Sequence, residues 1–233
     1  MWQCVAEGIE ARKRGRSVVP AFVCVKMICL YYEVRARRFM KTSTLYALMG
    51  PRGAGATTLV KMAMDMGINY VPVYTTEWLH GRSRRGALLK RMEPETFNDE
   101  RFFAQTGWRG YQYGWYKEDI LEAMATYRCN LILLNEAVIP TFRQLLRRNL
   151  VVIHLMADYT TLIERMGADK IPPEQIQEEL KYIEENKVLD GWKQADFVIK
   201  NMGTKETAFQ QLLAIMGLTR ALSAEELKEQ LSM

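Results

Sequence analysis

A glycine-rich segment that directly follows a short apolar run constrains the fold of this chain more than any other feature. Residues 45–57 read Leu-Tyr-Ala-Leu-Met-Gly-Pro-Arg-Gly-Ala-Gly-Ala-Thr, which matches the phosphate-binding pattern G-x-x-x-x-G-K-[ST] except at the lysine. Gly50 and Gly55 occupy the glycine positions, Thr57 occupies the hydroxyl position, and Ala56 stands in place of the lysine. Because this pattern joins a strand to a helix, it predicts an α/β domain with an anion-binding loop.

The loop is expected to bind phosphate mainly through its backbone. Successive N–H groups and the positive end of the following helix attract an anion without any charged side chain. The residues expected to hold the nucleotide are Gly50, Arg52, Gly53, Ala54, Gly55, Ala56, Thr57 and Thr58. The Thr57 hydroxyl is expected to ligate Mg²⁺, but Ala56 offers a methyl group where a lysine would reach the β- and γ-phosphates. A glycine-rich turn with no ligand is the alternative interpretation.

Apolar runs of strand length alternate with helix-like stretches through most of the chain. Strand candidates lie at 68–76, 130–135, 150–156 and 195–201, and helix candidates lie at 117–127, 141–148, 160–166, 173–192 and 204–216. The strand runs are almost continuously apolar, which is typical of a parallel sheet covered on both faces. We therefore predict a three-layer α/β fold. Residues 77–115, which are rich in aromatic side chains and irregular in pattern, are predicted to form an inserted lobe.

The net charge of +5 is concentrated in residues 1–39, which contain eight basic and three acidic side chains. The rest of the chain is balanced, so its charge gives no reason to expect nucleic acid as a partner. None of the four cysteines has metal-ligand or C-x-x-C spacing, which favours a reducing, cytoplasmic location. Residues 18–34 are apolar, but Lys26 and Glu33 interrupt them and they are too short for a transmembrane span.

We expect a basic extension in residues 1–39 and one domain in residues 40–233. Met40 and a short polar stretch precede the first strand, which is a common start for a compact phosphate-binding domain. Two interpretations of the extension stay open. It is either upstream sequence outside the native protein, or an amphipathic segment that contacts a membrane surface or a protein partner.

The order of these elements resembles that of the guanylate kinase family. Residues 74–76 resemble the family's S-x-T-T-R segment, 110–114 resemble G-N-Y-Y-G, 151–166 resemble a strand and R-L helix, and 197–201 resemble the terminal V-I-V-N. The similarity covers residues 43–217. It implies a P-loop NTPase-like parallel sheet of about five strands, an NMP-binding-type lobe at about 77–115, and a short lid at about 167–173. It also implies ATP and Mg²⁺ as cofactors and GMP as a candidate acceptor.

The sequence departs from the family at the acceptor site. Glu77 and His80 stand in place of the two arginines that clamp the acceptor phosphate, and Val73 and Ala104 stand in place of the pair that reads guanine. A carboxylate repels phosphate, and valine and alanine side chains cannot form hydrogen bonds. The substrate-binding candidates that remain are Thr75, Thr76, Arg82 and Tyr113.

The sequence also departs from the family at the donor site. Glu179 stands where the resemblance places an arginine, and Lys170 is the cation left in the lid segment. Transfer of a phosphoryl group depends on positive charge around the phosphates. Arg52 in the loop, Lys61 one turn into the helix, and Lys170 are therefore the candidate catalytic residues.

Together these residues predict a nucleotide-binding protein in which ATP-dependent phosphoryl transfer to GMP or another small phosphate acceptor is impaired or redirected. Mg²⁺ is expected at Thr57 and at Glu136, the acidic residue that closes the third strand; a solvated strand-end carboxylate is the alternative for Glu136. The alternative function is a non-catalytic guanylate kinase-like interaction or regulatory module, with a protein partner or a second copy of the chain. Aromatic residues in 108–116 would then anchor a peptide, stack on a base, or form the core of the lobe.

Overall fold

The computed structural model describes residues 43–77, 88–97, 101–108, 110–219 and 225. The predictions made for residues 1–39, for His80 and for Arg82 lie outside these residues.

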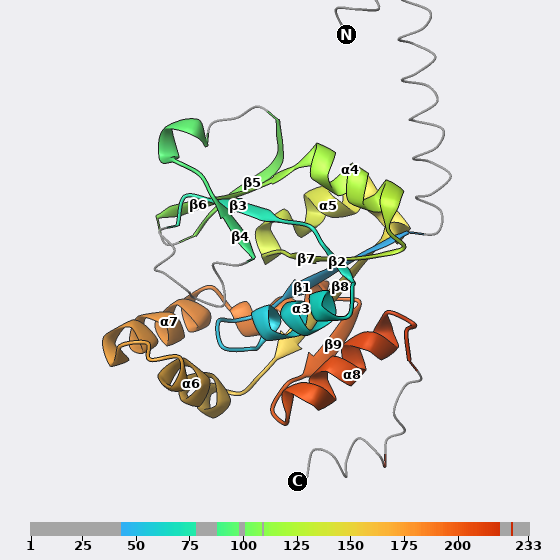
Figure 1. Ribbon diagram of the computed structural model, residues 1–233. Helices are drawn as coiled ribbons and strands as arrows, with labels where there is room; N and C mark the ends of the chain where they lie inside the picture. The colour runs from blue at the N-terminus through green and yellow to red at the C-terminus, as the bar shows by residue number, and fades with distance from the viewer. Residues whose placement is uncertain (1–42, 78–87, 98–100, 109, 220–224, 226–233) are drawn as a thin grey trace, which may run out of the picture.

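A five-stranded parallel sheet forms the centre of the described domain (Figure 1). Its strands, in spatial order, are β2 (Asn69–Tyr70), β7 (Cys129–Leu133), β1 (Thr44–Met49), β8 (Leu150–Met156) and β9 (Phe197–Lys200). All four pairings are parallel, and in the middle of the sheet Leu48 lies between Leu133 and Ile153. The prediction of a parallel sheet of about five strands is confirmed.

Helices cover both faces of this sheet, as the near-continuous apolar strands require. One face packs against α3 (Ala56–Asp65), α6 (Tyr159–Ala168), α7 (Pro173–Glu185) and α8 (Lys205–Ile215), and the other against α4 (Lys117–Thr126) and α5 (Ile139–Leu146). Side chains of β1 alternate between the two cores: Tyr46 and Leu48 enter one, and Leu45 and Ala47 enter the other. The predicted three-layer α/β architecture is confirmed.

A second sheet lies beside the central one (Figure 1). Its order is β4 (Leu89–Arg91), β3 (Val73–Thr75), β6 (Tyr111–Tyr116) and β5 (Phe102–Trp108), and a short 3-10 helix, η1 (Pro94–Thr96), follows β4. The aromatic residues that looked irregular in the sequence pack here. Phe102 stacks on Tyr116 at 4.3 Å and on Phe97 at 4.7 Å. Trp115 is buried and meets the edge of the Phe142 ring of α5, which anchors this sheet to the domain.

Two element predictions are wrong in detail. The single strand predicted at 68–76 is divided between the two sheets, because Pro72 has no N–H with which to continue a ladder. The helix predicted at 173–192 ends at Glu185, and a 3-10 helix, η4 (Val188–Gln194), follows it. Lys187 adopts a left-handed conformation with φ 51° between the two, which an uninterrupted right-handed helix cannot contain.

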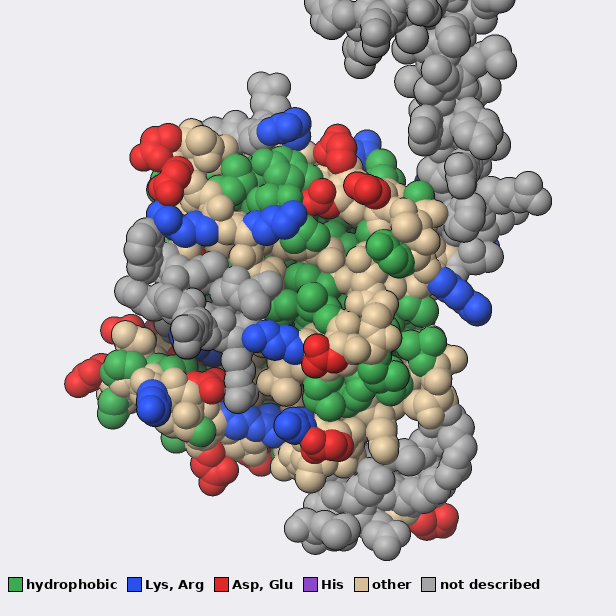
Figure 2. All heavy atoms as spheres, viewed as in Figure 1, with side chains coloured by type: hydrophobic (Ala, Val, Ile, Leu, Met, Phe, Trp, Pro, Cys, Tyr) green, Lys and Arg blue, Asp and Glu red, His purple; other side chains and the backbone are tan. Residues whose placement is uncertain are grey.

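Hydrophobic side chains gather on the surface over α3 and α8 (Figure 2). At this end of the domain Met66 is 61% exposed and Leu218 is 50% exposed. Among the described residues, no helix has the length and apolar character needed to cross a membrane.

Candidate functional site

The predicted phosphate-binding loop lies at the carboxyl end of β1 and leads directly into α3. Gly50 and Gly55 have φ angles of 147° and 97°, which favour glycine. The surroundings also exclude a side chain: a Cβ on Gly50 would lie 2.5 Å from the Leu155 carbonyl oxygen, and a Cβ on Gly55 would lie 2.5 Å from Asn201 Nδ2. The loop therefore has the strand-loop-helix setting of an anion site, and its first glycine, Gly50, is exposed.

Asn201 fixes the loop from the end of the last strand, and the sequence analysis did not single it out. Its side chain is 3% exposed, and its amide Nδ2 donates to the Ala54 carbonyl oxygen at 2.8 Å. Its position directly after the last strand could have indicated this role, because ligands bind at the carboxyl ends of the strands in parallel sheets.

Arg165 of α6 is a cation beside the loop that the sequence analysis also missed. Its Nη1 lies 3.4 Å from the Gly53 carbonyl oxygen, and its Nη2 lies 3.5 Å from Asn201 Oδ1 and from the Gly203 carbonyl oxygen. Burial lowers the pKa of Arg165, and nearby carboxylates oppose this shift. Its position in the segment that resembles the R-L helix could have indicated this role, but that resemblance was used only to predict the fold.

The three candidate catalytic cations have different surroundings. Arg52 lies in the loop, and its Nη1 is 3.8 Å from Glu179 Oε2 of α7. Lys61 lies on α3, and Lys170 lies in the turn between α6 and α7. Neither lysine side chain forms a hydrogen bond or ion pair with the described part of the chain. Of the three, Arg52 is the one that belongs to the loop itself.

Glu136 begins the 3-10 helix η2 (Glu136–Val138), three residues after β7 ends. Its Oε1 is buried without a hydrogen-bond partner among the described residues, and it packs against Gly191 of η4. Burial raises the pKa of Glu136, and the charge of Asp190 raises it further. A buried carboxylate oxygen without a partner at this edge of the sheet is suited to a cation.

Mg²⁺ fits this arrangement without a dedicated cage. Within the described ranges there is no group of three or more His, Cys, Asp or Glu side chains that could hold a metal ion. Mg²⁺ commonly keeps several waters and binds through one or two carboxylates plus substrate phosphates. Thr57 lies in the first turn of α3, and Glu136 begins η2 beyond the carboxyl end of β7.

On the acceptor side, the predicted substrate-binding hydroxyls are engaged within the second sheet. Thr75 Oγ1 donates to the Gln112 carbonyl oxygen at 2.9 Å, and Thr76 Oγ1 accepts from the Gln112 N–H at 2.9 Å. Tyr113 donates its hydroxyl to Glu77 Oε2 at 2.6 Å. These contacts hold β3 against β6, and they place a carboxylate at the end of β3.

The aromatic residues of the β5–β6 hairpin serve mainly as core. Tyr113 and Trp115 are 6% and 2% exposed, whereas Tyr111 is 38% exposed. Trp108 lies 6.1 Å from the Tyr113 ring and 6.0 Å from the Tyr182 ring, and through Tyr182 the hairpin reaches α7. The interpretation as a lobe core therefore accounts for the buried part of this aromatic group.

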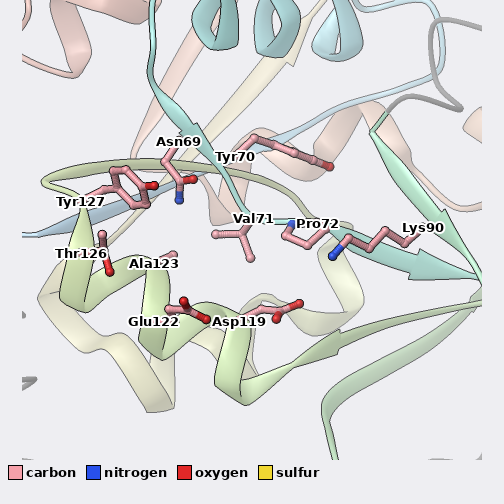
Figure 3. Close-up of a pocket in the computed structure, with 10 residues that line it drawn as sticks. All are labelled: Asn69, Tyr70, Val71, Pro72, Lys90, Asp119, Glu122, Ala123, Thr126 and Tyr127. Atoms are coloured by element: carbon pink, nitrogen blue, oxygen red, sulfur yellow. The ribbon is translucent and has the colours of Figure 1, made fainter. Parts of the chain in front are cut away.

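A hollow of about 250 Å³ lies between α4 and the segment that joins the two sheets (Figure 3). It is lined by Asn69, Tyr70, Val71, Pro72, Lys90, Asp119, Glu122, Ala123, Thr126 and Tyr127. Lys90 Nζ donates to the Tyr74 hydroxyl at 3.2 Å, which donates to Asp119 at 2.9 Å. Burial, and then Asp119, raises the pKa of Tyr74 to about 12. Lys90 and Asp119 are thus connected through the Tyr74 hydroxyl, and no residue of the 50–57 loop lines the hollow.

Comparison with solved structures shows a fold similar to that of a guanylate kinase. The structure resembles guanylate kinase from Anaplasma phagocytophilum, with a TM-score of 0.54 and 17% identity over 81% of this chain and 94% of that chain. Shikimate kinases from Acinetobacter baumannii and Bacteroides thetaiotaomicron also match, with TM-scores of 0.43 and 0.42 and identities of 16% and 15%. They cover 80% and 75% of this chain and 99% of each of theirs.

No protein-family model matches the sequence, and a search of curated proteins found no similar sequence. At 17% identity the likeness to guanylate kinase extends to the fold alone. The chain therefore shares the fold of this guanylate kinase at low sequence identity.

Proposed function

We propose that this protein binds a nucleotide, ATP with Mg²⁺, through its phosphates at residues 50–57. The observation that carries the proposal is the loop itself, because its glycine conformations and its position between β1 and α3 present backbone donors to an anion. Bound Mg²⁺ would neutralise phosphate charge, and Thr57 and Glu136 are its proposed protein ligands. Asn201 holds the loop in shape, and Arg165 adds a positive charge beside it.

We further propose that phosphoryl transfer is impaired or redirected. Ala56 removes the charge that would follow the migrating phosphoryl group. Loss of one preorganised charge-stabilising donor typically lowers kcat by about 10²–10³. Glu77 places a carboxylate on the acceptor side, where it disfavours a nucleoside monophosphate. GMP is therefore a poor acceptor in this proposal, and a different phosphate acceptor is expected if the protein is an enzyme.

The second candidate is a non-catalytic interaction or regulatory module. It is favoured by the engagement of Thr75, Thr76 and Tyr113 within the second sheet, which gives these side chains a structural role in place of substrate binding. A protein partner or a second copy of the chain would then be the ligand of the lobe. Retention of the loop favours nucleotide binding over this alternative.

Thermal unfolding with ATP, ADP, AMP, GMP and GDP, each with and without Mg²⁺, tests nucleotide binding. A ligand at 100 times its Kd adds about 2.7 kcal/mol. For a domain of this size that corresponds to a rise in Tm of about 5–11 °C. We expect the largest rise with ATP and Mg²⁺, and no rise in a Gly55→Ala variant. If no nucleotide raises the Tm of the wild type, the proposal is wrong.

Restoring the missing charges tests the impairment. Ala56→Lys and Glu77→Arg, singly and together, are expected to increase ATP-to-GMP transfer, with the double variant most active. Wild-type turnover within about 1–100 s⁻¹, the usual range of kinases, would refute impaired transfer. If the double variant gains no activity while the wild type still binds nucleotide, Val73 and Ala104 have changed the acceptor.

A further inference from the structure

Arg52 of the 50–57 loop is paired with a buried carboxylate of α7. Arg52 Nη1 lies 3.8 Å from Glu179 Oε2, and the two side chains are 35% and 3% exposed. Position 179 is also the one at which the resemblance to guanylate kinases places an arginine. In this chain the positive charge is that of Arg52 in the loop, and α7 carries the negative charge of Glu179.

We propose that Glu179 is a specificity-determining residue of the phosphate site, where its carboxylate offsets the charge of Arg52 and makes phosphate binding depend on a divalent cation. This inference rests on the proposed function, because it concerns the same loop. It assigns a role to a residue that does not ligate the metal and does not take part in transfer.

The loop itself supplies little net positive charge. Ala56 contributes none, and that of Arg52 is offset by Glu179. Arg165 directs its N–H groups to the carbonyl oxygens of Gly53 and Gly203 and to Asn201, so its charge is shared with the loop's own dipoles. A buried carboxylate interacts through a lower dielectric than an exposed one, so its repulsion of an arriving polyphosphate is screened less. Divalent metal lowers the negative charge of the polyphosphate and therefore lowers this repulsion.

Packing of α7 keeps the carboxylate beside the loop. Ile183, one turn after Glu179, is 1% exposed in the core, and Tyr182 meets the ring of Trp108 at 6.0 Å. Glu179 itself is 2% exposed, so its carboxylate is held out of water beside Arg52. The repulsion is therefore expected to persist when a ligand arrives.

The test measures the affinity of the full chain for inorganic tripolyphosphate by calorimetry, with Mg²⁺ and with EDTA. The wild type is expected to bind at least about tenfold tighter with Mg²⁺, since like charges brought together cost several kcal/mol. Glu179→Gln is expected to reduce this ratio at least about fivefold by raising the metal-free affinity. Glu178→Gln, the neighbouring exposed glutamate on the same helix, is the matched control and should leave the ratio unchanged.

Two further variants separate charge from packing. Glu179→Asp keeps the carboxylate and should keep the metal dependence even if the side chain packs less well. In Arg52→Gln/Glu179→Gln, the gain of Glu179→Gln should be lost, because the released cation is gone. Thermal unfolding of each variant confirms that it is folded.

The outcomes distinguish this inference from the proposed function. If the wild type binds ATP with Mg²⁺ but Glu179→Gln keeps the wild-type ratio, or binds more weakly with and without metal, the role of Glu179 is wrong and nucleotide binding stands. If the wild type binds no polyphosphate and Glu179→Gln does, the role of Glu179 stands and the proposed wild-type function is wrong. If neither binds, both are wrong.

Discussion

Replacing Gly55 by alanine is expected to destabilise the protein more than the same replacement at Gly67, and to abolish phosphate binding. Both glycines have left-handed backbones, with φ 97° and 84°. They differ in their surroundings: a Cβ on Gly55 would lie 2.5 Å from Asn201 Nδ2, whereas a Cβ on Gly67 has no neighbour within 4 Å. Gly67→Ala therefore measures the backbone strain alone.

The expected difference in stability between the two variants follows from the surroundings of the two glycines. Left-handed strain in a residue other than glycine costs about 1–2 kcal/mol, and it applies to both variants. At Gly55 the Asn201 amide must also move, which breaks its 2.8 Å hydrogen bond to the buried Ala54 carbonyl. Leaving such an acceptor without a partner costs about 1–3 kcal/mol. At about 2–4 °C per kcal/mol, the Tm of Gly55→Ala should lie about 2–12 °C below that of Gly67→Ala.

Differential scanning calorimetry gives the two Tm values, and calorimetric titration with ATP and Mg²⁺ gives the affinities. Gly67→Ala should bind as the wild type does, because it lies at the far end of α3 from the loop. Equal Tm losses in the two variants would show that the Asn201 contact does not hold the loop in its observed shape. Unchanged binding by Gly55→Ala would show that the ligand does not use this backbone.

Three further predictions concern pH and the N-terminal segment. His154 is fully buried with no partner for either ring nitrogen among the described residues, and burial lowers its pKa. Its contribution to stability should therefore be intact above pH 6.5 and be lost as the pH falls below that value. Urea unfolding measured from pH 8 to 5 should show this loss in the wild type but not in His154→Phe. The pKa of Glu136 is raised, so its effect on stability runs in the opposite direction: the stability is present below pH 4.5 and is lost as the pH rises through the pKa of the folded state. Glu136→Gln should therefore have a higher Tm than the wild type at pH 8. The same variant should show a smaller effect of Mg²⁺ on ATP affinity. Deletion of residues 1–39 should leave the Tm nearly unchanged, and a fall of many degrees would show that residues 18–34 belong to the core.

Much of the fold could be predicted because its determinants are local in sequence. The apolar runs gave the central parallel strands, and the loop pattern gave the junction between β1 and α3. Errors arose where a local pattern was interrupted by one residue, as at Pro72, or where two patterns merged, as between α7 and η4. The hairpin of β5 and β6 was missed because its aromatic side chains face several directions and give no clean two-residue period.

By itself, the sequence determined the glycine-rich loop between β1 and α3 and the absence of a lysine from it, because the loop is built from consecutive residues. The tertiary structure alone decided which side chains surround it. Asn201 and Arg165 reach the loop from the last strand and from α6, and Glu179 reaches Arg52 from α7, 127 positions further along the chain. Contacts between residues so far apart produce no periodic pattern in a single sequence, so they could not be predicted from it. They exist because parallel strands bring their carboxyl ends to one edge of the sheet, where the charges of separate helices meet.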